Sequence, residues 1–177
     1  MSVSYLTPSF DAPADVTRSP IEGSLAHDLA DGATTAALTF AGQGWRWWDD
    51  LGSLLARRPW LRDRARRWSD RIAELAATPS LVDLAALRHG FDPLRWIDDA
   101  RTRPDDGELS ALAVSLPGVL LTQLLAYREA WEDGLSHAVE AGSLVATTGH
   151  SGGVIAAAAV AARPDGLDDD EAVGAYL

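Results

Sequence analysis

The apolar and polar positions of the chain predict two short buried strands, each followed by a glycine-containing turn and then a helix. The first apolar run covers residues 35–41 and ends at Gly42-Gln43-Gly44. The second covers residues 143–148 and ends at Gly149. Two strands that each lead into a helix indicate a parallel α/β sheet with flanking helices, with the functional site at the carboxyl ends of the strands.

Between and after these strands, the spacing of the apolar residues is that of helices. Asp92-Pro93 is a predicted helix start, with Asp at the N-cap and Pro at the first helical position. Ser110 is the predicted cap of a long helix that continues to Glu132 and is interrupted at Pro117-Gly118. The other helices are predicted over residues 24–30, 45–58, 60–77, 154–162 and 171–177, with a short apolar turn or helix at 81–88 and a solvated loop at 103–107.

The first residues differ in composition from the rest of the chain. Residues 1–22 are rich in Ser, Pro, Asp and Thr, which is typical of an irregular arm. They contain no basic segment followed by an apolar core, so they do not form a secretory signal. Residues 23–177 are long enough for one domain with a hydrophobic core. The predicted organisation is an arm followed by a single α/β domain.

Composition and charge exclude several classes of function. The formal net charge is -11, from 26 acidic residues and 15 basic residues that are all arginine, so the chain lacks the positive field of a nucleic-acid-binding protein. The absence of cysteine excludes disulfides, thiolate metal ligands and a cysteine nucleophile. No apolar run reaches the length of a membrane span. We therefore expect a cytoplasmic protein with no bound metal and no nucleic-acid or membrane partner.

The segment Gly149-His150-Ser151-Gly152-Gly153 fits Gly-x-Ser-x-Gly, the pattern of a nucleophile elbow. A strand before it and a helix after it are the context that this motif needs, because the sharp turn exposes the serine hydroxyl. Ser151 is therefore the candidate nucleophile, and the backbone N–H of Gly152 is a candidate oxyanion donor. A second donor must come from another strand-to-helix turn, and the backbone of Gln43 is its natural source.

A general base for Ser151 is missing from the pattern. No histidine follows Ser151, although elbow hydrolases have the order Ser, then Asp or Glu, then His. His150 is adjacent to the serine, and neighbouring side chains in a tight turn point apart. His137 is predicted to face solvent in the loop before the second strand, and the remaining histidines are His27 and His89. Either the base comes from sequence outside these residues, or the chain is not catalytic alone.

Other conspicuous residues have structural interpretations. Gly42-Gln43-Gly44 does not extend to a dinucleotide fingerprint, because Trp47 occupies the position of the third glycine. Trp45, Trp47 and Trp48 are interpreted as core and edge packing rather than as a ligand cage. The arginines between residues 57 and 71 are interpreted as a solvated helix face or as a docking face for an acidic partner.

The run Phe40-Ala41-Gly42-Gln43-Gly44, followed about a hundred residues later by the elbow, resembles the acyltransferases of fatty-acid and polyketide synthesis. The segments from Gly90 to Trp96 and from Ser115 to Gln123 are similar to the N-terminal acyltransferase domain of actinobacterial type I fatty acid synthase. The fungal synthase beta chain begins with a similar domain. The resemblance runs from Thr35 to the C-terminus and implies the α/β-hydrolase-like core of the malonyl/acetyl transferase family.

The resemblance implies a starter acyltransferase that binds no cofactor of its own. An acetyl group passes from coenzyme A to Ser151, and then to the phosphopantetheine thiol of an acyl carrier protein. The backbone amides of Gln43 and Gly152 form the oxyanion hole, while His150 and Gln123 belong to the substrate site. The implied partners are acyl-CoA, the carrier domain and the rest of a synthase polypeptide that forms a homo-oligomer.

Two departures from the family pattern affect this interpretation. Gly152 stands where the family usually has Gln or Leu. The family's catalytic histidine and its ferredoxin-like subdomain follow the elbow and are absent from these residues. We therefore expect the first part of a longer acyltransferase domain, inactive alone. Two alternatives stay open: a non-catalytic docking or assembly remnant, and a serine esterase of the α/β-hydrolase type, which needs Asp and His after the elbow.

Overall fold

The computed structural model describes residues 25–42, 46–77, 90–162, 167 and 173, and every structural statement below refers to them. Three predicted segments lie outside this part of the chain: the arm at residues 1–22, the turn or helix at 81–88, and nearly all of the helix at 171–177.

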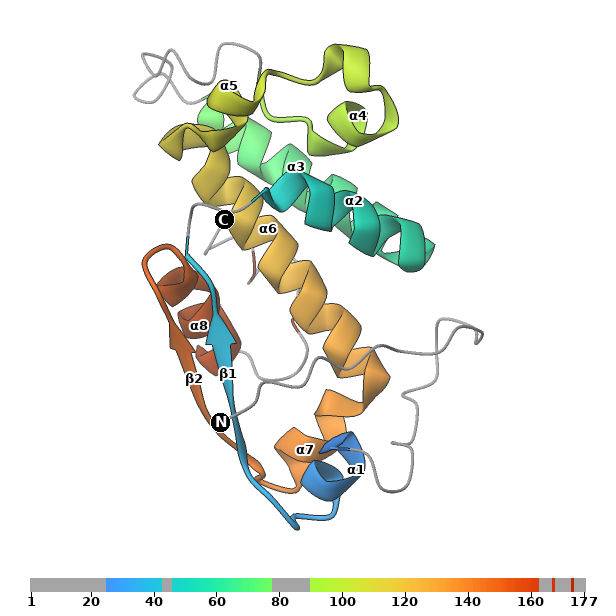
Figure 1. The fold of residues 1–177 in the computed structure, drawn as a ribbon, viewed down its shortest axis with the longest axis vertical. Helices are drawn as coiled ribbons and strands as arrows, with labels where there is room; N and C mark the ends of the chain where they lie inside the picture. The colour runs from blue at the N-terminus through green and yellow to red at the C-terminus, as the bar shows by residue number, and fades with distance from the viewer. Residues whose placement is uncertain (1–24, 43–45, 78–89, 163–166, 168–172, 174–177) are drawn as a thin grey trace.

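The sheet consists of two parallel strands, as predicted. Strand β1 (Ala36–Phe40) pairs with β2 (Leu144–Gly149) so that Phe40 lies opposite Gly149. Helix α8 (Gly153–Ala162) follows β2 directly and packs against both strands (Figure 1). The described part of the chain is therefore an α/β structure with a small parallel sheet and mostly helices, in which the carboxyl ends of both strands lie together.

The prediction that both strands are buried is wrong. Ala37 and Thr39 of β1 are exposed, as are Val145, Ala146 and Thr148 of β2. The described helices shield only part of this sheet, so the alternation of side chains along β1 leaves every second residue in contact with water. The apolar character of these runs reflects short alanine and valine residues rather than complete burial.

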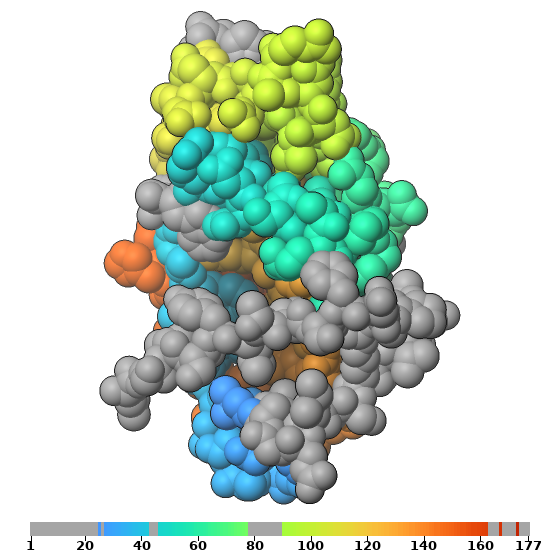
Figure 2. Space-filling model, turned by 45° about the vertical axis from the view of Figure 1, so that its right-hand side comes forward, coloured from blue at the N-terminus to red at the C-terminus, as the bar shows by residue number. Residues whose placement is uncertain are grey.

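The helical body is built from elements that follow β1 in the sequence. They are α2 (Trp47–Arg57), the 3₁₀ turn η1 (Pro59–Leu61), α3 (Arg62–Ala76), α4 (Pro93–Asp98), the 3₁₀ turn η3 (Ala100–Thr102) and α5 (Asp106–Ser110). In the space-filling view these elements form one contiguous body, with α1 and the start of β1 at the other end of the molecule (Figure 2). Pro59 separates α2 from α3 as expected.

The helix starts follow local hydrogen bonding. Asp92 caps α4, with its Oδ1 accepting from the backbone N–H of Arg95 at 3.2 Å, as predicted. The predicted loop at 103–107 is shorter than expected, because Asp105 caps α5 by accepting from the N–H of Glu108 at 2.9 Å. Asp105 therefore begins a short helix within a segment that the sequence pattern predicts to be a solvated loop.

The long helix α6 (Leu112–Ala130) crosses the centre of the molecule (Figure 1). Two predictions about it are wrong: Ser110 ends α5 instead of capping α6, and the helix continues through Pro117-Gly118 without interruption. Pro117 removes one hydrogen bond near the start of the helix, and the buried residues from Gly118 to Leu125 hold the turns that follow. Neither α6 nor any other described helix is long and apolar enough to cross a membrane.

After α6 the chain turns back toward the sheet. A π-helical turn, η4 (Trp131–Leu135), contains Gly134 at φ 106°, and α7 (Ser136–Glu140) follows it. Helix α1 (Leu25–Ala30) packs against α7 at the lower end of Figure 1. His137 therefore lies in a helix and is half-buried, which corrects the prediction of a solvent-facing loop.

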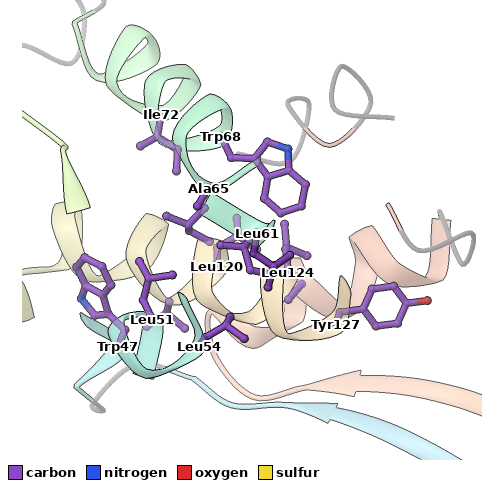
Figure 3. Close-up of a cluster of buried hydrophobic side chains, with 14 of the residues drawn as sticks. Trp47, Leu51, Leu54, Leu61, Ala65, Trp68, Ile72, Leu120, Leu124 and Tyr127 are labelled. Atoms are coloured by element: carbon purple, nitrogen blue, oxygen red, sulfur yellow. The ribbon is translucent and has the colours of Figure 1, made fainter. Parts of the chain in front are cut away.

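The main core lies among α2, α3 and α6 (Figure 3). Trp47 is fully buried, its ring stacks on Phe91 and its Nε1 donates to the carbonyl of Leu109 at 3.2 Å. Trp48 is buried beside it, so both described tryptophans of this segment are packing residues, as predicted. The core side chains labelled in the close-up are Trp47, Leu51, Leu54, Leu61, Ala65, Trp68, Ile72, Leu120, Leu124 and Tyr127.

The arginines of α3 make ion pairs within the chain. Arg62 reaches Asp98 at 2.6 Å, and Arg66 reaches Asp92 at 2.8 Å, which ties α3 to α4. These pairs are partly exposed and lie at the surface. The interpretation as a solvated helix face therefore fits the structure better than a docking face for an acidic partner.

Candidate active site

Ser151 occupies a strained turn between β2 and α8. Its φ is 52°, in the left-handed region that residues with a side chain rarely adopt. The turn spans only the residues between Gly149, the last of β2, and Gly153, the first of α8, and the serine is exposed. A serine held at positive φ between a strand and a helix is the geometry of a nucleophile elbow.

The glycines of the motif are required by close backbone packing. A Cβ on Gly149 would overlap the backbone of Gly153 and Val154. A Cβ on Gly153 would lie 2.5 Å from the carbonyl oxygen of Ala41, at the end of β1. The spacing of the two glycines around Ser151 is therefore a consequence of how tightly the turn is folded against the sheet.

The first glycine turn lies directly against the elbow. A Cβ on the buried Gly42 would lie 2.7 Å from the carbonyl oxygen of His150 and 2.8 Å from Cβ of Ser151. The backbone N–H of His150 donates to the carbonyl of Phe40 at 3.0 Å, which extends the pairing of the two strands into the turns. The structure thus brings together the two segments that the sequence singled out.

The start of α8 provides an open backbone donor. The N–H groups of Gly153, Val154 and Ile155 donate to carbonyls of the elbow at 2.9–3.1 Å. Among the described residues, no backbone carbonyl accepts from the N–H of Gly152, which lies at the N-terminal end of the helix. Gln43 lies outside the described residues, so its predicted part in the oxyanion hole stays a prediction, as does that of Gly152.

Gln123 of α6 contacts the end of β1. Its Nε2 donates to the carbonyl oxygen of Ala41 at 2.6 Å, and the side chain is only 5% exposed. Its Oε1 is buried and has no hydrogen-bond partner among the described residues. Beside it lies a cavity of about 600 Å³ between β1 and α6, lined mainly by apolar side chains. The lining residues are Leu38, Thr39, Phe40, Ala41, Asp50, Gln123, Ala126, Tyr127, Ala130 and Leu135.

One candidate site residue, Gln123, lines this cavity, and its place at a substrate site stays a prediction. Tyr127 and Asp50 also line the cavity and were not among the candidate residues. Tyr127 follows Gln123 by four residues on one helix, so the two share a face of α6, and this spacing was the available signal. Asp50 comes from α2 and had no comparable signal in the sequence.

The described histidines other than His150 are far from the elbow. His27 lies in α1 and His137 in α7, which pack together at the end of the molecule opposite the carboxyl ends of the strands (Figure 1). His150 is exposed in the elbow itself, and His89 lies outside the described residues. The part of the chain that the structure describes therefore places no histidine from another element beside Ser151, the candidate nucleophile.

The parallel strands, the left-handed serine and the adjoining glycine turn define an α/β domain with a nucleophile elbow. Comparison with known families identifies which one: residues 38–167 match the family described as "Starter unit:ACP transacylase in aflatoxin biosynthesis". The chain belongs to this family. The matched residues include both glycine turns and all of the elbow.

Curated relatives agree with this assignment. The chain is 32% identical to the fatty acid synthase beta subunit TOXC of Cochliobolus carbonum over 145 residues, which is 80% of this chain and 7% of the relative. It is 31% identical to the fatty acid synthase subunit beta of Gibberella zeae over 145 residues, 78% of this chain and 7% of the relative. The resemblance to fatty acid synthase acyltransferases is therefore confirmed, and the chain spans about 7% of the length of these relatives.

Proposed function

We propose that this chain carries the nucleophile of an acyltransferase domain that loads a starter acyl group, acetyl in the simplest case, onto an acyl carrier protein. The observation that supports the proposal most directly is the left-handed Ser151, held between Gly149 and Gly153 and packed against the turn at the end of β1. Membership of the starter-unit transacylase family supports the same reaction.

In the first half-reaction, Oγ of Ser151 attacks the thioester carbonyl carbon of acyl-CoA. The serine proton passes to a general base and the carbonyl oxygen becomes an oxyanion. The C–S bond then breaks while the base gives its proton to the departing sulfur, which releases coenzyme A as the thiol. The proposal assigns stabilisation of the oxyanion to the N–H groups of Gly152 and Gln43. Loss of one such donor typically costs about 3 kcal/mol of transition-state stabilisation.

In the second half-reaction, the phosphopantetheine thiol of the carrier protein attacks the acyl-serine ester. The thiol proton passes to the general base and the sulfur forms the new thioester bond. The C–O bond breaks, and the base gives that proton to Oγ of Ser151. No oxidant, reductant or metal is consumed. A thioester is exchanged for a thioester, so the protein has to supply positioning and oxyanion stabilisation rather than a driving force.

The proposal places the substrate beside the elbow. His150 is exposed next to Ser151, where it would contact an incoming thioester, and Gln123 borders the mainly apolar cavity between β1 and α6. Neither His27 nor His137 is near Ser151 in the described structure, so the proposal assigns the general base to a histidine outside the described residues.

The proposal is tested by acyl-enzyme formation in the full-length protein. We expect incubation with radiolabelled acetyl-CoA to label wild type through an ester bond and to leave Ser151→Ala unlabelled. Ser110→Ala, at an exposed serine of α5, is the matched control and should label like wild type. Addition of the phosphopantetheinylated carrier protein should then remove the label from the serine, whereas the unmodified carrier should not.

Equal labelling of Ser151→Ala and wild type would show that Ser151 is not the nucleophile. Absence of label from wild type with acetyl-CoA and with longer acyl-CoA donors would instead favour the docking or assembly interpretation. Labelled protein that releases free acid faster than it transfers acyl groups to the carrier would favour the esterase. We expect the 177 residues alone to give no turnover, since loss of a base lowers kcat by several orders of magnitude.

A further inference from the structure

We infer that Gln123 is a positioning residue for the elbow: its side-chain amide holds the Ala41 carbonyl and thereby keeps Gly42 packed against Ser151. The inference rests on the proposed function, in which Ser151 is the nucleophile. It adds a residue from α6, an element that precedes the elbow by many residues, to the set that determines the geometry of the serine.

The Ala41 carbonyl is close to two other elements. Nε2 of Gln123 in α6 donates to its oxygen at 2.6 Å. Gly153 of α8 is also close, since a Cβ on it would come within 2.5 Å of the same oxygen. The end of β1 is therefore clamped between the middle of α6 and the first residue of α8.

The peptide groups on either side of Ala41 contact the elbow. The carbonyl of Phe40 accepts from the N–H of His150 at 3.0 Å, and a Cβ on Gly42 would lie 2.8 Å from Cβ of Ser151. Any shift of Ala41 thus moves the backbone on which the serine rests. Displacements of about 1 Å in a catalytic site are enough to lower rates by about 100-fold.

The residue type at position 123 indicates that the donor is what matters. Oε1 of Gln123 is buried and finds no hydrogen-bond partner in the part of the chain that the structure describes, and a buried acceptor without a partner is unfavourable. An apolar side chain of the same length would avoid that cost and would also suit this otherwise apolar stretch of α6. A glutamine supplies an N–H donor that stays protonated at every physiological pH, which neither methionine nor an ionised glutamate supplies.

Single-turnover acylation of the full-length protein tests the inference. We expect Gln123→Met, which keeps the length and removes the donor, to lower the saturating acylation rate by about 10- to 100-fold. The half-saturating acyl-CoA concentration should change less than about threefold, because the effect is on geometry rather than on substrate contact. The matched control is Thr122→Val, which removes buried hydrogen bonds to Gly118 and Trp47 from the same helix and should keep the rate within about twofold of wild type.

A pH profile separates positioning from packing. Gln123→Glu has the shape of glutamine but donates to the Ala41 carbonyl only when its carboxyl group is protonated, and burial raises the pKa of such a group. The ratio of the acylation rates of Gln123→Glu and Gln123→Met should therefore be largest at low pH. It should fall to one or below as pH rises, because an ionised carboxylate donates no hydrogen bond and is repelled by the carbonyl oxygen. The general base is common to both variants, so its titration cancels from the ratio.

Hydrogen exchange of the full-length protein gives a readout that does not depend on activity. The His150 amide should exchange at least about tenfold faster in Gln123→Met than in wild type, with no such change in Thr122→Val, because its acceptor Phe40 precedes the clamped residue. The inference would be overturned if Gln123→Met kept both the wild-type exchange rate of the His150 amide and the wild-type acylation rate. It would also be overturned by a Gln123→Glu to Gln123→Met rate ratio that does not change with pH. The same holds if Gln123→Met changed only the half-saturating acyl-CoA concentration. Failure of wild type to label Ser151 would count against the proposed function alone, and the exchange result would still decide this inference.

Discussion

Gly118 of α6 packs directly against the ring of Trp47, so closely that a Cβ on the glycine would lie 2.6 Å from Cζ2 of the indole. Trp47 is the first residue of α2 and is fully buried. The contact fixes the distance between α2 and α6, the two helices that flank the main core. It also explains why a glycine stands inside a helix, where it is otherwise unfavourable.

Gly118→Ala should therefore destabilise the protein by about 1–3 kcal/mol, because the indole has to move within a close-packed core. Gly52→Ala is the matched control: its Cβ would meet Ile97 at an ordinary 3.6 Å, and alanine favours a helix, so we expect a gain of about 0.5–1 kcal/mol. Urea unfolding followed by circular dichroism measures both. Equal effects of the two substitutions would show that helix propensity rather than the Trp47 contact decides the outcome.

The start of α8 offers a second prediction. Gly153→Ala should destabilise the elbow by about 1–3 kcal/mol, because the new methyl group would press on the Ala41 carbonyl, and it should also reduce acylation of Ser151. Val154→Ala, at an exposed position next to it, should change stability by less than about 0.5 kcal/mol. Thermal unfolding together with labelling by acyl-CoA checks both effects. Normal stability and labelling in Gly153→Ala would contradict the close approach of the two turns.

Arg58 links α2 to the end of α6. It is only 10% exposed, its Nε lies 2.9 Å from Glu129 and its guanidinium 2.6 Å from Asp133. Arg58→Met should cost about 2–3 kcal/mol, because it leaves two half-buried carboxylates without their main partner. Arg57, 42% exposed and 3.3 Å from Glu129, is the matched position, and Arg57→Met should cost less than about 0.5 kcal/mol. Chemical denaturation measures the free energy of unfolding of both variants. Similar losses of stability in Arg58→Met and Arg57→Met would show that the ion pairs of Arg58 contribute no more than those of an exposed surface arginine.

The side chain of Asp92 combines two roles that substitutions can separate. It caps α4 and also pairs with Arg66 at 2.8 Å. Asp92→Ala should cost about 1 kcal/mol and Asp92→Asn less than about 0.5 kcal/mol, because asparagine keeps the cap and an exposed ion pair contributes little. Thermal unfolding in low and high salt measures the difference. If asparagine were as damaging as alanine, the ion pair rather than the cap would be the stabilising contact.

The tight turn that holds Ser151 could be predicted from the sequence because the features that build it are local. The Gly-x-Ser-x-Gly spacing and the glycine turn after β1 both reflect steric limits that act over a few residues. The pairing of the two strands also followed from local patterns, since each strand leads into a helix. The oxyanion roles of Gln43 and Gly152 and the substrate roles of His150 and Gln123 stay predictions.

Other features depended on contacts between distant segments and could not be predicted. The passage of α6 through Pro117 depends on burial against α2, which the local pattern at Pro117-Gly118 does not show. The exposure of β1 and β2 depends on how few described elements cover the sheet. The partner of Gln123, the carbonyl of Ala41, lies 82 positions away in the sequence.

The order of the elements has a consequence for synthesis on the ribosome. All of α2 through α7 lies between the two strands, so β1 finds its only described partner after most of this chain has been made. Pairing across so long a separation closes slowly, after the local helices have formed. A nascent chain that still lacks α8 would carry the first glycine turn without the elbow that rests on it. The serine therefore acquires its reactive geometry only after α2 through α7 and β2 have been made, and a shorter nascent chain would have no acyl-accepting site to occupy.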